Sequence, residues 1–546
     1  MDRKGPPVDW VERTMIPRRP WFPRLLPLLT ANALLPPGPD WAVLGDRWWS
    51  HVRFLADDRL EGRDTGSRGY DQAAEYVAEQ FRAAGLAPSG SEGFFQRMEF
   101  NVVRPDEPHS SFEMLHDEVA TPLRFGEEVA PFLTVGTAPE VEAEAVFSGY
   151  GLTVPELAYD DLATPSVRGR IVVLLSGGPA DMPGPIKAHY QSMEERRRSL
   201  RTAGAVGMVR IANPKSIDLP WARMASSRFE ARMELRDPGE DVPVGLPLTT
   251  YFNTDRAEVL FRHSGHSFSE VLSALEADRP LPRFPLNVRL RARAAVVRST
   301  VSSKNVVGVY PGTDPKLRNE YVAVSAHLDH IGVGEPIRGD TIYSGAMDNA
   351  SGVASLIEIA RSMQACGARP RRSVLFLAVA GEEKGLLGSK YFAARPTVTG
   401  PIVADLNLDM FNPIFSLNYL EVQGLDESSL GDDIRAVAEP SGVQVQPDQE
   451  PEHNLFIRSD QYSFIKKGVP ALAFKFSYLP GTPEETLFKA WLTERYHAPS
   501  DDLEQPVDLP AAARFNAILE RLILRVADAD DRPRWKPESF FNRFVR

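Results

Sequence analysis

The sequence predicts an α/β protein built on a doubly wound, mostly parallel central sheet that is flanked by helices. From residue 300 to 530, short apolar runs typical of buried strands alternate with segments whose apolar residues recur at helical spacing. From about 120 to 282 the pattern changes to short β-like runs that are separated by glycines, prolines and charges, which predicts a second, β-rich module. We therefore divide the chain into a leader, a first part of the main domain, an inserted module, the main part of the domain and a tail, at residues 1–44, 45–119, 120–282, 283–530 and 531–546.

The N-terminal segment has two interpretations. From Met15 onward, basic residues precede a short apolar stretch, "MIPRRPWFPRLLPLLTANALLPP", which is similar to a weak signal peptide. The alternative is a proline-rich leader of a cytoplasmic protein. We expect export to the periplasm or the extracellular space.

The first helix is expected in "GYDQAAEYVAEQFRAAGL". Its apolar side chains Ala73, Ala74, Val77 and Phe81 share one face, and Gly85 supplies a stop signal. A strand, "FFQRMEFNVV", follows. The inserted module then offers the β-like runs "EAEAVFSGYG", "GRIVVLLSGG" and "AVGMVRIA", the last of them fed by a helix that begins in "SMEERRRSLRTAG".

The main part of the domain shows the alternation most clearly. "YVAVSAHLD" predicts a buried strand, and "NASGVASLIEIARSMQA" predicts a helix with Val353, Leu356, Ile357 and Ala360 in one stripe. Further strands are expected in "SVLFLAVA", "ADLNLDM" and "VPALAF". A last helix presents an apolar face made of Phe515, Ile518, Leu519, Leu522 and Val526.

Composition and charge narrow the functional classes. The 546 residues are 43% apolar and 25% charged, which are globular values, and the net charge of −12 argues against nucleic acid or an anionic membrane as the main partner. No apolar run reaches the roughly 20 residues that cross a bilayer. Cys366 is the single cysteine, so an internal disulfide and a cysteine-based zinc site are both excluded.

Polar residues follow the predicted strands where those strands end. His327 and Asp329 end one strand, Glu382 and Glu383 follow the next, and Asp409 ends a third. Asp348 stands just before a helix, and His497 lies in the loop "YHAPSDD". Taken singly, each has an ordinary interpretation, such as a helix cap for Asp348 or solvated loop charges for the two glutamates. In open α/β sheets, however, the carboxyl ends of the strands meet where ligands bind, so together these residues predict a metal site.

The donor set also indicates which metal and how many ions. Two histidines and three carboxylates exceed the need of one tetrahedral zinc, and suit two zinc ions about 3.5–4 Å apart that share a carboxylate and a water. Nitrogen and oxygen donors favour Zn²⁺, although Co²⁺ or Mn²⁺ fit as well. Asp329 lies on the same side of its strand as His327 and can accept an N–H from that imidazole or from its surroundings.

These motifs resemble those of a known family. "AHLDHIG", "GAMDNASGVA", "AGEEKGLLGSKYF", "NLDM", "SDQYSFIKKGVPALAF" and "YHAPSDD" are similar to the motifs of the co-catalytic zinc aminopeptidases, a family that includes glutamate carboxypeptidase, glutaminyl cyclase and the transferrin receptor. The resemblance covers residues 300–530, and residues 48–115 more weakly. The 120–282 module, through "VRGRIVVLLSGG" and "RTAGAVGMVRIAN", resembles the protease-associated domain that some members insert.

The resemblance implies a zinc exopeptidase fold and a role for each residue. Asp348 would bridge the two ions, with His327 and Asp409 completing one site and Glu383 and His497 the other. Glu382 would be the general base and then the general acid of peptide hydrolysis, and Asp329 would support His327. The family also implies a cis peptide bond between Asp348 and Asn349.

Several alternatives stay open at this point. An aminopeptidase acting on peptides is the first hypothesis, and a carboxypeptidase or dipeptidase of the same family is the second, with Arg338, Arg458 and Lys475 as conceivable carboxylate anchors. A cyclase or a non-catalytic receptor is less compatible with the inserted module and the intact ligand set. Gln461 stands where many relatives have His, which concerns specificity. Residues 476–496 are expected to roof the substrate cleft, and the oligomeric state is left open.

Overall fold

The computed structural model describes residues 1–2, 39–163, 165–216, 220–237 and 245–545. The chain divides into two compact units, Met1–Asp40 and Trp41–Arg546. Most of the expected leader lies outside the described residues, so export remains a prediction. Only its end is described, where helix α1 (Trp41–Leu55) begins inside the segment assigned to the leader. Among the described residues, no helix combines the length and the apolar character needed to span a membrane.

A ten-stranded sheet, the large sheet, organises the second unit, in the order β11-β2-β14-β18-β15-β19-β22-β20-β21 with β1 beside β14. The four central strands β18, β15, β19 and β22 are parallel, whereas β14 and β20 join them antiparallel on either side. The predicted parallel sheet is thus confirmed at the centre, where the site residues are attached. The strands are β1 (Ala87–Pro88), β2 (Phe95–Pro105), β11 (Arg232–Leu235), β14 (Val296–Tyr310), β15 (Tyr321–His327), β18 (Ser373–Val379), β19 (Ile402–Asn407), β20 (Tyr419–Gln423), β21 (Gln444–Gln446) and β22 (Ala471–Ser477).

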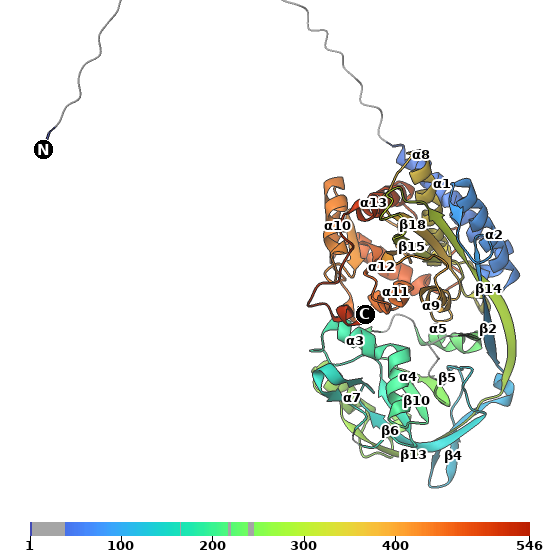
Figure 1. Cartoon of the computed structure of the whole chain (residues 1–546). Coiled ribbons are helices and arrows are strands. Elements are labelled where there is room, and N and C mark those ends of the chain that lie inside the picture. The colour runs from blue at the N-terminus through green and yellow to red at the C-terminus, as the bar shows by residue number, and fades with distance from the viewer. Residues whose placement is uncertain (3–38, 164, 217–219, 238–244, 546) are drawn as a thin grey trace, which may run out of the picture. The chain divides into compact units, whose positions relative to one another are not determined.

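Helices cover both faces of the large sheet, as a doubly wound fold requires. Helices α1, α2 (Arg68–Ala83), α8 (Ser351–Ala365) and α13 (Leu509–Asp528) share one apolar core with alternate residues of the central strands (Figure 1). Helices α9 (Leu387–Ala394) and α11 (Gln461–Ile465) pack on the opposite face. In β15, Val322 and Val324 point to the first core and Ala323 to the second, because side chains alternate along a strand. The predicted apolar stripes of α8 and α13 are buried, which confirms both helices.

A second, eight-stranded sheet is built from residues 111–293, a wider range than the 120–282 expected for the inserted module. Its order is β4-β3-β13-β6-β9-β10-β12-β5. That it folds as an independent, protease-associated domain remains a prediction. Its strands are β3 (Ser111–His116), β4 (Val119–Pro122), β5 (Val129–Pro131), β6 (Glu140–Ser148), β9 (Ile171–Leu175), β10 (Gly207–Ile211), β12 (Leu248–Phe252) and β13 (Arg283–Arg293), and its helices are α3 (Gly184–Gln191), α4 (Met193–Thr202), α5 (Trp221–Ser226), α6 (Glu258–Phe261) and α7 (Phe268–Glu276).

Three connections join the second sheet to the large one. Strands β2 and β14 pair along their whole shared length (Figure 1). Along the chain, β2 leads into β3 of the second sheet, and β13 of the second sheet leads into β14. Between β10 and β12 of the second sheet, the chain crosses to the large sheet, where strand β11 pairs with β2 at the edge. In addition, His189 Nδ1 lies 2.6 Å from the Tyr462 hydroxyl and Lys466 Nζ lies 3.0 Å from a Glu194 oxygen, so α3 and α4 contact α11. The second sheet is therefore held beside the strand ends that carry the predicted ligands.

Candidate metal centre

The predicted ligands converge at the carboxyl edge of the parallel strands. His327 is the last residue of β15, and Asp409 and Glu383 stand in the loops just after β19 and β18. A π-helical turn, Ala346–Ala350, brings Asp348 to the same edge before α8 begins. His497 arrives from the far side, just after helix α12 (Pro483–Glu494). The edge of a parallel sheet gathers these loops because all its strands end on one side.

Asp348 lies between the two histidines. Its Oδ1 is 3.2 Å from Nε2 of His327, and its Oδ2 is 3.3 Å from Nε2 of His497. On the first side, His327 Nε2 also lies 3.2 Å from Oδ1 of Asp409. On the second side, His497 Nε2 lies 3.4 Å from Oε2 of Glu383. The two oxygens of one carboxylate thus face two different groups, and all five predicted ligands are brought together.

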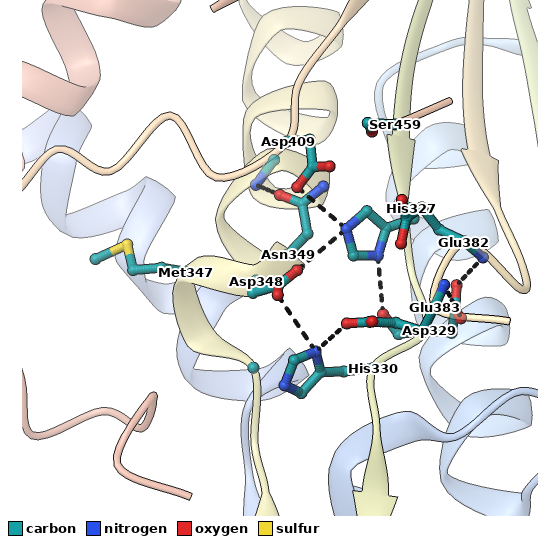
Figure 2. A network of polar contacts seen from close by, with 12 residues as sticks. His327, Asp329, His330, Met347, Asp348, Asn349, Glu382, Glu383, Asp409 and Ser459 are labelled. Atoms are coloured by element: carbon teal, nitrogen blue, oxygen red, sulfur yellow. Dashed lines mark hydrogen bonds and ion pairs between the residues drawn. The ribbon is translucent and has the colours of Figure 1, made fainter. Parts of the chain in front are cut away.

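The turn that carries Asp348 is held by several hydrogen bonds. The peptide bond between Asp348 and Asn349 is cis, which confirms that prediction. The backbone N–H groups of Met347 and Asp348 donate to the two oxygens of Asp501, at 2.9 and 3.0 Å. The Asn349 side chain donates to the Leu408 carbonyl oxygen at 2.7 Å, close to Asp409 (Figure 2). Sequence reasoning missed Asp501, although it stands in the "YHAPSDD" motif that contributes His497.

Asp329 is fully buried and contacts His327 through its backbone. The carbonyl oxygen of Asp329 lies 3.0 Å from Nδ1 of His327, which leaves Nε2 directed at Asp348 and Asp409. Its carboxylate instead accepts hydrogen bonds from the Thr65 hydroxyl at 3.0 Å and from the backbone N–H groups of Glu382 and Glu383 at 3.2 and 3.3 Å. Of the two expected contacts of this carboxylate, the structure shows the one with the surroundings of the imidazole, namely with the loop that carries both glutamates.

His330 is a site residue that the sequence analysis did not select. Its side chain is fully buried, and its Nδ1 lies 2.8 Å from Oε1 of Glu383 and 3.9 Å from Oδ2 of Asp348 (Figure 2). Its Nε2 is buried and, within the described part of the chain, has no hydrogen-bond partner. The only sequence signal was the second histidine of "HLDH", three residues after His327.

Arg63 supports the site from behind. It is completely buried, and its guanidinium donates to the carbonyl oxygens of Leu328, Ser344 and Gly345 at 3.0, 2.6 and 3.0 Å. These acceptors flank the loops that carry His330 and Asp348, so Arg63 joins the two loops. Burial lowers the pKa of Arg63 to about 10, against the opposing effect of nearby carboxylates such as Asp501.

The electrostatics of the site reflect close pairing of acids and bases. Burial lowers the pKa of His497, but Glu383 and Asp348 outweigh it and raise the pKa to about 9. Burial raises the pKa of Asp348, but the neighbouring histidines hold it well below its usual range. Glu382 behaves differently, because burial, joined by the carboxylates of Asp409 and Glu383, raises its pKa well above the usual value against the effect of His327. The two adjacent glutamates therefore differ. Glu383 is paired with histidines and favours its charged form, whereas Glu382 favours its protonated form.

The donor set fits metal ions. Two groups offer ligand atoms that all lie within 4.8 Å of one another: His327, Asp348 and Asp409, and His330, Asp348 and Glu383. Several carboxylates gathered with little exposure to water require a compensating cation. Imidazole and carboxylate donors without thiolates suit zinc. Asp409 and His497, with 18% and 25% of their side chains exposed, mark the side on which the centre opens.

A cavity of about 390 Å³, the apolar cavity, opens onto this centre. Helix α12 and the residues after it form one wall with Phe488, Leu492 and Tyr496, which places part of the 476–496 segment over the cleft. Gln461 lies at the wall, where its Oε1 accepts from Asn407 Nδ2 at 2.7 Å and its Nε2 donates to the Phe456 carbonyl at 3.1 Å. Gln461 thus links the strand that precedes Asp409 to the 455–456 segment of the cavity wall.

The three conceivable carboxylate anchors are placed differently. Arg338 is exposed in the turn between β16 (Gly332–Ile337) and β17 (Asp340–Tyr343), and it does not line the apolar cavity. Lys475 lines the cavity, but its ammonium lies 3.1 Å from Glu421 and 3.8 Å from Glu450. Arg458 also lines it and donates to the His453 carbonyl oxygen at 3.2 Å.

Comparison with known proteins identifies similar sequences and folds. Residues 305–523 match the sequence model of Peptidase family M28. The leupeptin-inactivating enzyme 1 of Streptomyces exfoliatus is 31% identical over 114 residues, which are 20% of this chain and 23% of that enzyme. A probable zinc metalloprotease of Pyricularia oryzae is 38% identical over 101 residues, 18% of this chain and 19% of that protein. The chain thus spans less than a quarter of the length of these curated relatives.

A solved structure shares the fold. The aminopeptidase from Aneurinibacillus sp. strain AM-1 matches with a TM-score of 0.54 and 19% identity, over 91% of this chain and all of that one. Because 91% of the chain is covered, the match includes residues of the second sheet as well as the large one.

Proposed function

Residues 305–523 belong to peptidase family M28, and from this premise we propose that the chain is a dinuclear zinc exopeptidase, in the first instance an aminopeptidase. The observation that carries the proposal is the position of Asp348. One of its oxygens faces His327 and Asp409, and the other faces Glu383 and His497. A carboxylate with one oxygen toward each of two donor groups is suited to join two ions.

The chain's own residues supply positioning and proton transfer. When bound, zinc would contribute Lewis acidity, which polarises the scissile carbonyl and acidifies water. Glu382 lines the apolar cavity next to His327 and Asp409, and its raised pKa suits a group that accepts a proton from water and returns it to the leaving amine. Asp329 holds the backbone of Glu382 and Glu383, so that the base and the ligand keep different directions.

The pairing of charges in the apolar cavity favours an aminopeptidase over a carboxypeptidase. A free substrate amine needs carboxylates beside the metals, and Glu382, Asp409 and Glu450 line this cavity. Of the cations in the same lining, Arg232 pairs with Glu230 and Lys384 with Asp64. Lys475, the one buried cation proposed as a carboxylate anchor, is already engaged by Glu421 and Glu450. A receptor without catalysis is disfavoured by the assembly of all five ligands and Glu382.

Two measurements test the proposal. Elemental analysis of the purified protein should find about two zinc ions per chain, and a chelator should abolish hydrolysis until Zn²⁺ is returned. A screen of aminoacyl substrates and of dipeptides blocked at either end should show that a free amino terminus is required. One ion in a fully active preparation would contradict the bridged pair, and a need for a free carboxyl terminus alone would favour the carboxypeptidase.

A further inference from the structure

A second cavity opens onto the metal centre from the side of the second sheet. Its volume is about 570 Å³, and we call it the arginine cavity because Arg104, Arg210, Arg223 and Arg232 line it. It shares Phe132, Arg232, Glu383, Lys384 and His497 with the apolar cavity, so the two cavities adjoin beside the metal centre. A peptide bound across both cavities would therefore lie beside two of the proposed ligands.

The arginines of this cavity are incompletely neutralised. Arg232 pairs with Glu230 at 3.5 Å, and Lys384 pairs with Asp64 at 2.9 Å. Arg223 donates to the backbone oxygens of Tyr496 and Thr493 instead of a carboxylate. Within the described ranges of the chain, no ion pair joins a carboxylate to Arg104, Arg210 or Arg223.

More positive charge lies behind the cavity wall. Arg232 and Arg197 contact the ring of Phe132, with 4.2 and 4.9 Å from each guanidinium carbon to the ring centre, and Phe132 lines both cavities. Nε and Nη2 of Arg197 are buried, and among the described residues they have no hydrogen-bond partner. Arg196 is fully buried and donates to the Tyr150 carbonyl oxygen at 2.6 Å. Arg196 and the Nε and Nη2 atoms of Arg197 are buried without an ion pair to a carboxylate in the described part of the chain, which is costly, so a nearby anion in this cavity would stabilise them.

The two cavities therefore differ in what they attract. The apolar cavity offers carboxylates, which suit a substrate's amino group, and apolar walls such as Phe488 and Leu492. Its cations Arg232, Lys384 and Lys475 each pair with a carboxylate. The arginine cavity offers guanidinium groups, which bind carboxylates through charge-assisted hydrogen bonds. A zwitterionic peptide would lie with its amino end in the first cavity and its carboxyl end in the second.

We infer that the arginine cavity binds the leaving, carboxyl-terminal part of the substrate, and that Arg210 and Arg104 select short peptides that carry a carboxylate there. This inference rests on the proposed exopeptidase function and gives the second sheet a role in substrate choice. Arg210 is half-buried on β10, donates from Nε to the Ser176 hydroxyl at 2.6 Å, and lies over the Tyr251 ring, so its remaining N–H groups are oriented before substrate binds.

The test compares three substrates on the zinc-loaded, full-length protein: Leu-Gly-Gly, its carboxyl-terminal amide, and leucine 4-nitroanilide. We expect kcat/KM for the free acid to exceed that for the amide by roughly ten- to a hundredfold, the scale of a hydrogen bond to a charged group. Arg104→Met/Arg210→Met should bring this ratio close to one, and Arg210→Lys should restore part of it. Turnover of the anilide, which has no carboxylate, should stay within about twofold in every variant.

Arg97→Met is the matched control. Arg97 also stands on β2 and is exposed, as Arg104 is, but it pairs with Glu92 and lines neither cavity. This variant should keep the wild-type ratio. The inference is overturned if the double variant keeps the preference for the free acid while the anilide is still turned over, or if the wild-type protein does not distinguish acid from amide.

Two further arms separate the remaining possibilities. Leu-Glu-Gly amide carries only a side-chain carboxylate; if it matches Leu-Gly-Gly and loses this advantage in the double variant, the cavity reads an acidic side chain as well as a chain terminus. If the zinc-loaded protein hydrolyses none of the substrates, the proposed function fails. Calorimetric binding of Leu-Gly-Gly and its amide to the same proteins then decides the inference: tighter binding of the acid that is lost in the double variant supports it, and equal binding overturns it.

Discussion

Nδ1 of His330 lies 2.8 Å from Oε1 of Glu383, and the His330 side chain is fully buried. His497 reaches the other oxygen of the same carboxylate at 3.4 Å. Glu383 is therefore held from both sides, and its pKa is lowered because these histidines outweigh the effect of burial. Substitution should have different effects on zinc binding at a residue that only donates a hydrogen bond to Glu383 and at a residue that binds the metal itself.

We predict that His330 orients Glu383 by donating a hydrogen bond. His330→Ala should weaken the zinc site of Glu383 by about 10- to 100-fold, the usual effect of losing a partner of a metal ligand. His330→Gln, which keeps a donor, should lose less. Zinc affinity measured by competition with a chelating dye, and zinc content after dialysis, provide the readout.

His497 provides the comparison for this prediction. His497→Ala should abolish the second ion, and His497→Gln should not rescue it, because a ligand and not a donor is lost. If His330→Gln loses the ion completely while His497→Gln retains it, His330 is the ligand and the two histidines exchange roles.

The adjacent glutamates should separate in the same kind of experiment. Glu382→Gln should keep both ions and the melting temperature while turnover falls about a hundredfold or more, the scale of losing a general base. Glu383→Gln should lose one ion and be partly rescued by added zinc. Metal content and turnover measured on both variants are the test, and the assignment is wrong if Glu382→Gln is the variant that loses metal.

Turnover should also depend on pH through Glu382. Burial raises the pKa of Glu382, so the carboxyl binds a proton more readily than an exposed glutamate, and a base works only when deprotonated. We therefore expect kcat/KM to fall on the acid side at a higher pH than the ordinary pKa of about 4.3 would give. In Glu382→Gln the residual activity should lack this acid limb while zinc occupancy, followed in parallel, is unchanged over the same range. An identical acid limb in both proteins would assign it to another group.

Much of the site was predictable because it depends on strand ends. His327, Glu383 and Asp409 each follow an apolar run, and parallel strands gather such ends at one edge. His330, Asp501 and Arg63 were not predictable in the same way. Their roles depend on where loops turn back after the strands, and local periodicity carries no information about that.

The residue bounds of the second sheet were also hard to predict, because they depend on pairing between strands that lie far apart in the sequence. The sequence pattern was expected to change near residues 120 and 282, whereas β3 and β13 of the second sheet lie outside this range. The crossing of β11 to the large sheet depends on pairing between residues about 130 apart, such as Arg232 with Val103. The sequence of a short strand without clear apolar alternation does not indicate which strand it pairs with.

A buried histidine where the second sheet meets α11 should make stability depend on pH. Burial lowers the pKa of His189 to about 4, and Arg543 and Lys466 add to the effect. In the unfolded chain the pKa is about 6.5, so between pH 6.5 and 4 the unfolded state binds more protons. The free energy of unfolding should therefore fall as pH falls through this window, by about 3 kcal/mol from this residue.

The contribution of His189 is measured as a difference, because other groups titrate in the same range. His189→Gln keeps a hydrogen-bonding group for the Tyr462 hydroxyl but cannot take up the proton. Urea unfolding at pH 7, 5.5 and 4.5 should show a smaller loss for the variant than for the wild type. Equal losses in both proteins would mean that His189 takes up its proton in the folded protein as readily as in the unfolded chain.

Removing the second sheet tests its boundaries and its role together. All five predicted ligands lie outside residues 111–293. The two ends of that segment are close, since the Ala295 N–H donates to the Ser110 hydroxyl at 3.0 Å. Deletion of 111–293 with a short glycine linker should therefore leave a folded protein that binds zinc. Its melting temperature should fall, because Met98 and Phe100 lose the cover of Met233 on β11.

Deletion of 120–282 is the matched comparison, because it leaves β3 and β13 without the strand β6 on which β13 pairs. Exposed, unpaired strand edges promote aggregation, so this shorter deletion should give less soluble protein than the longer one. The longer deletion also removes Arg210 and Phe132 from the arginine cavity. It should hydrolyse leucine 4-nitroanilide and no longer prefer Leu-Gly-Gly over its amide. If the shorter deletion is the more soluble one, the module ends near 120 and 282 after all; if the longer one keeps the preference, the second sheet does not select the substrate.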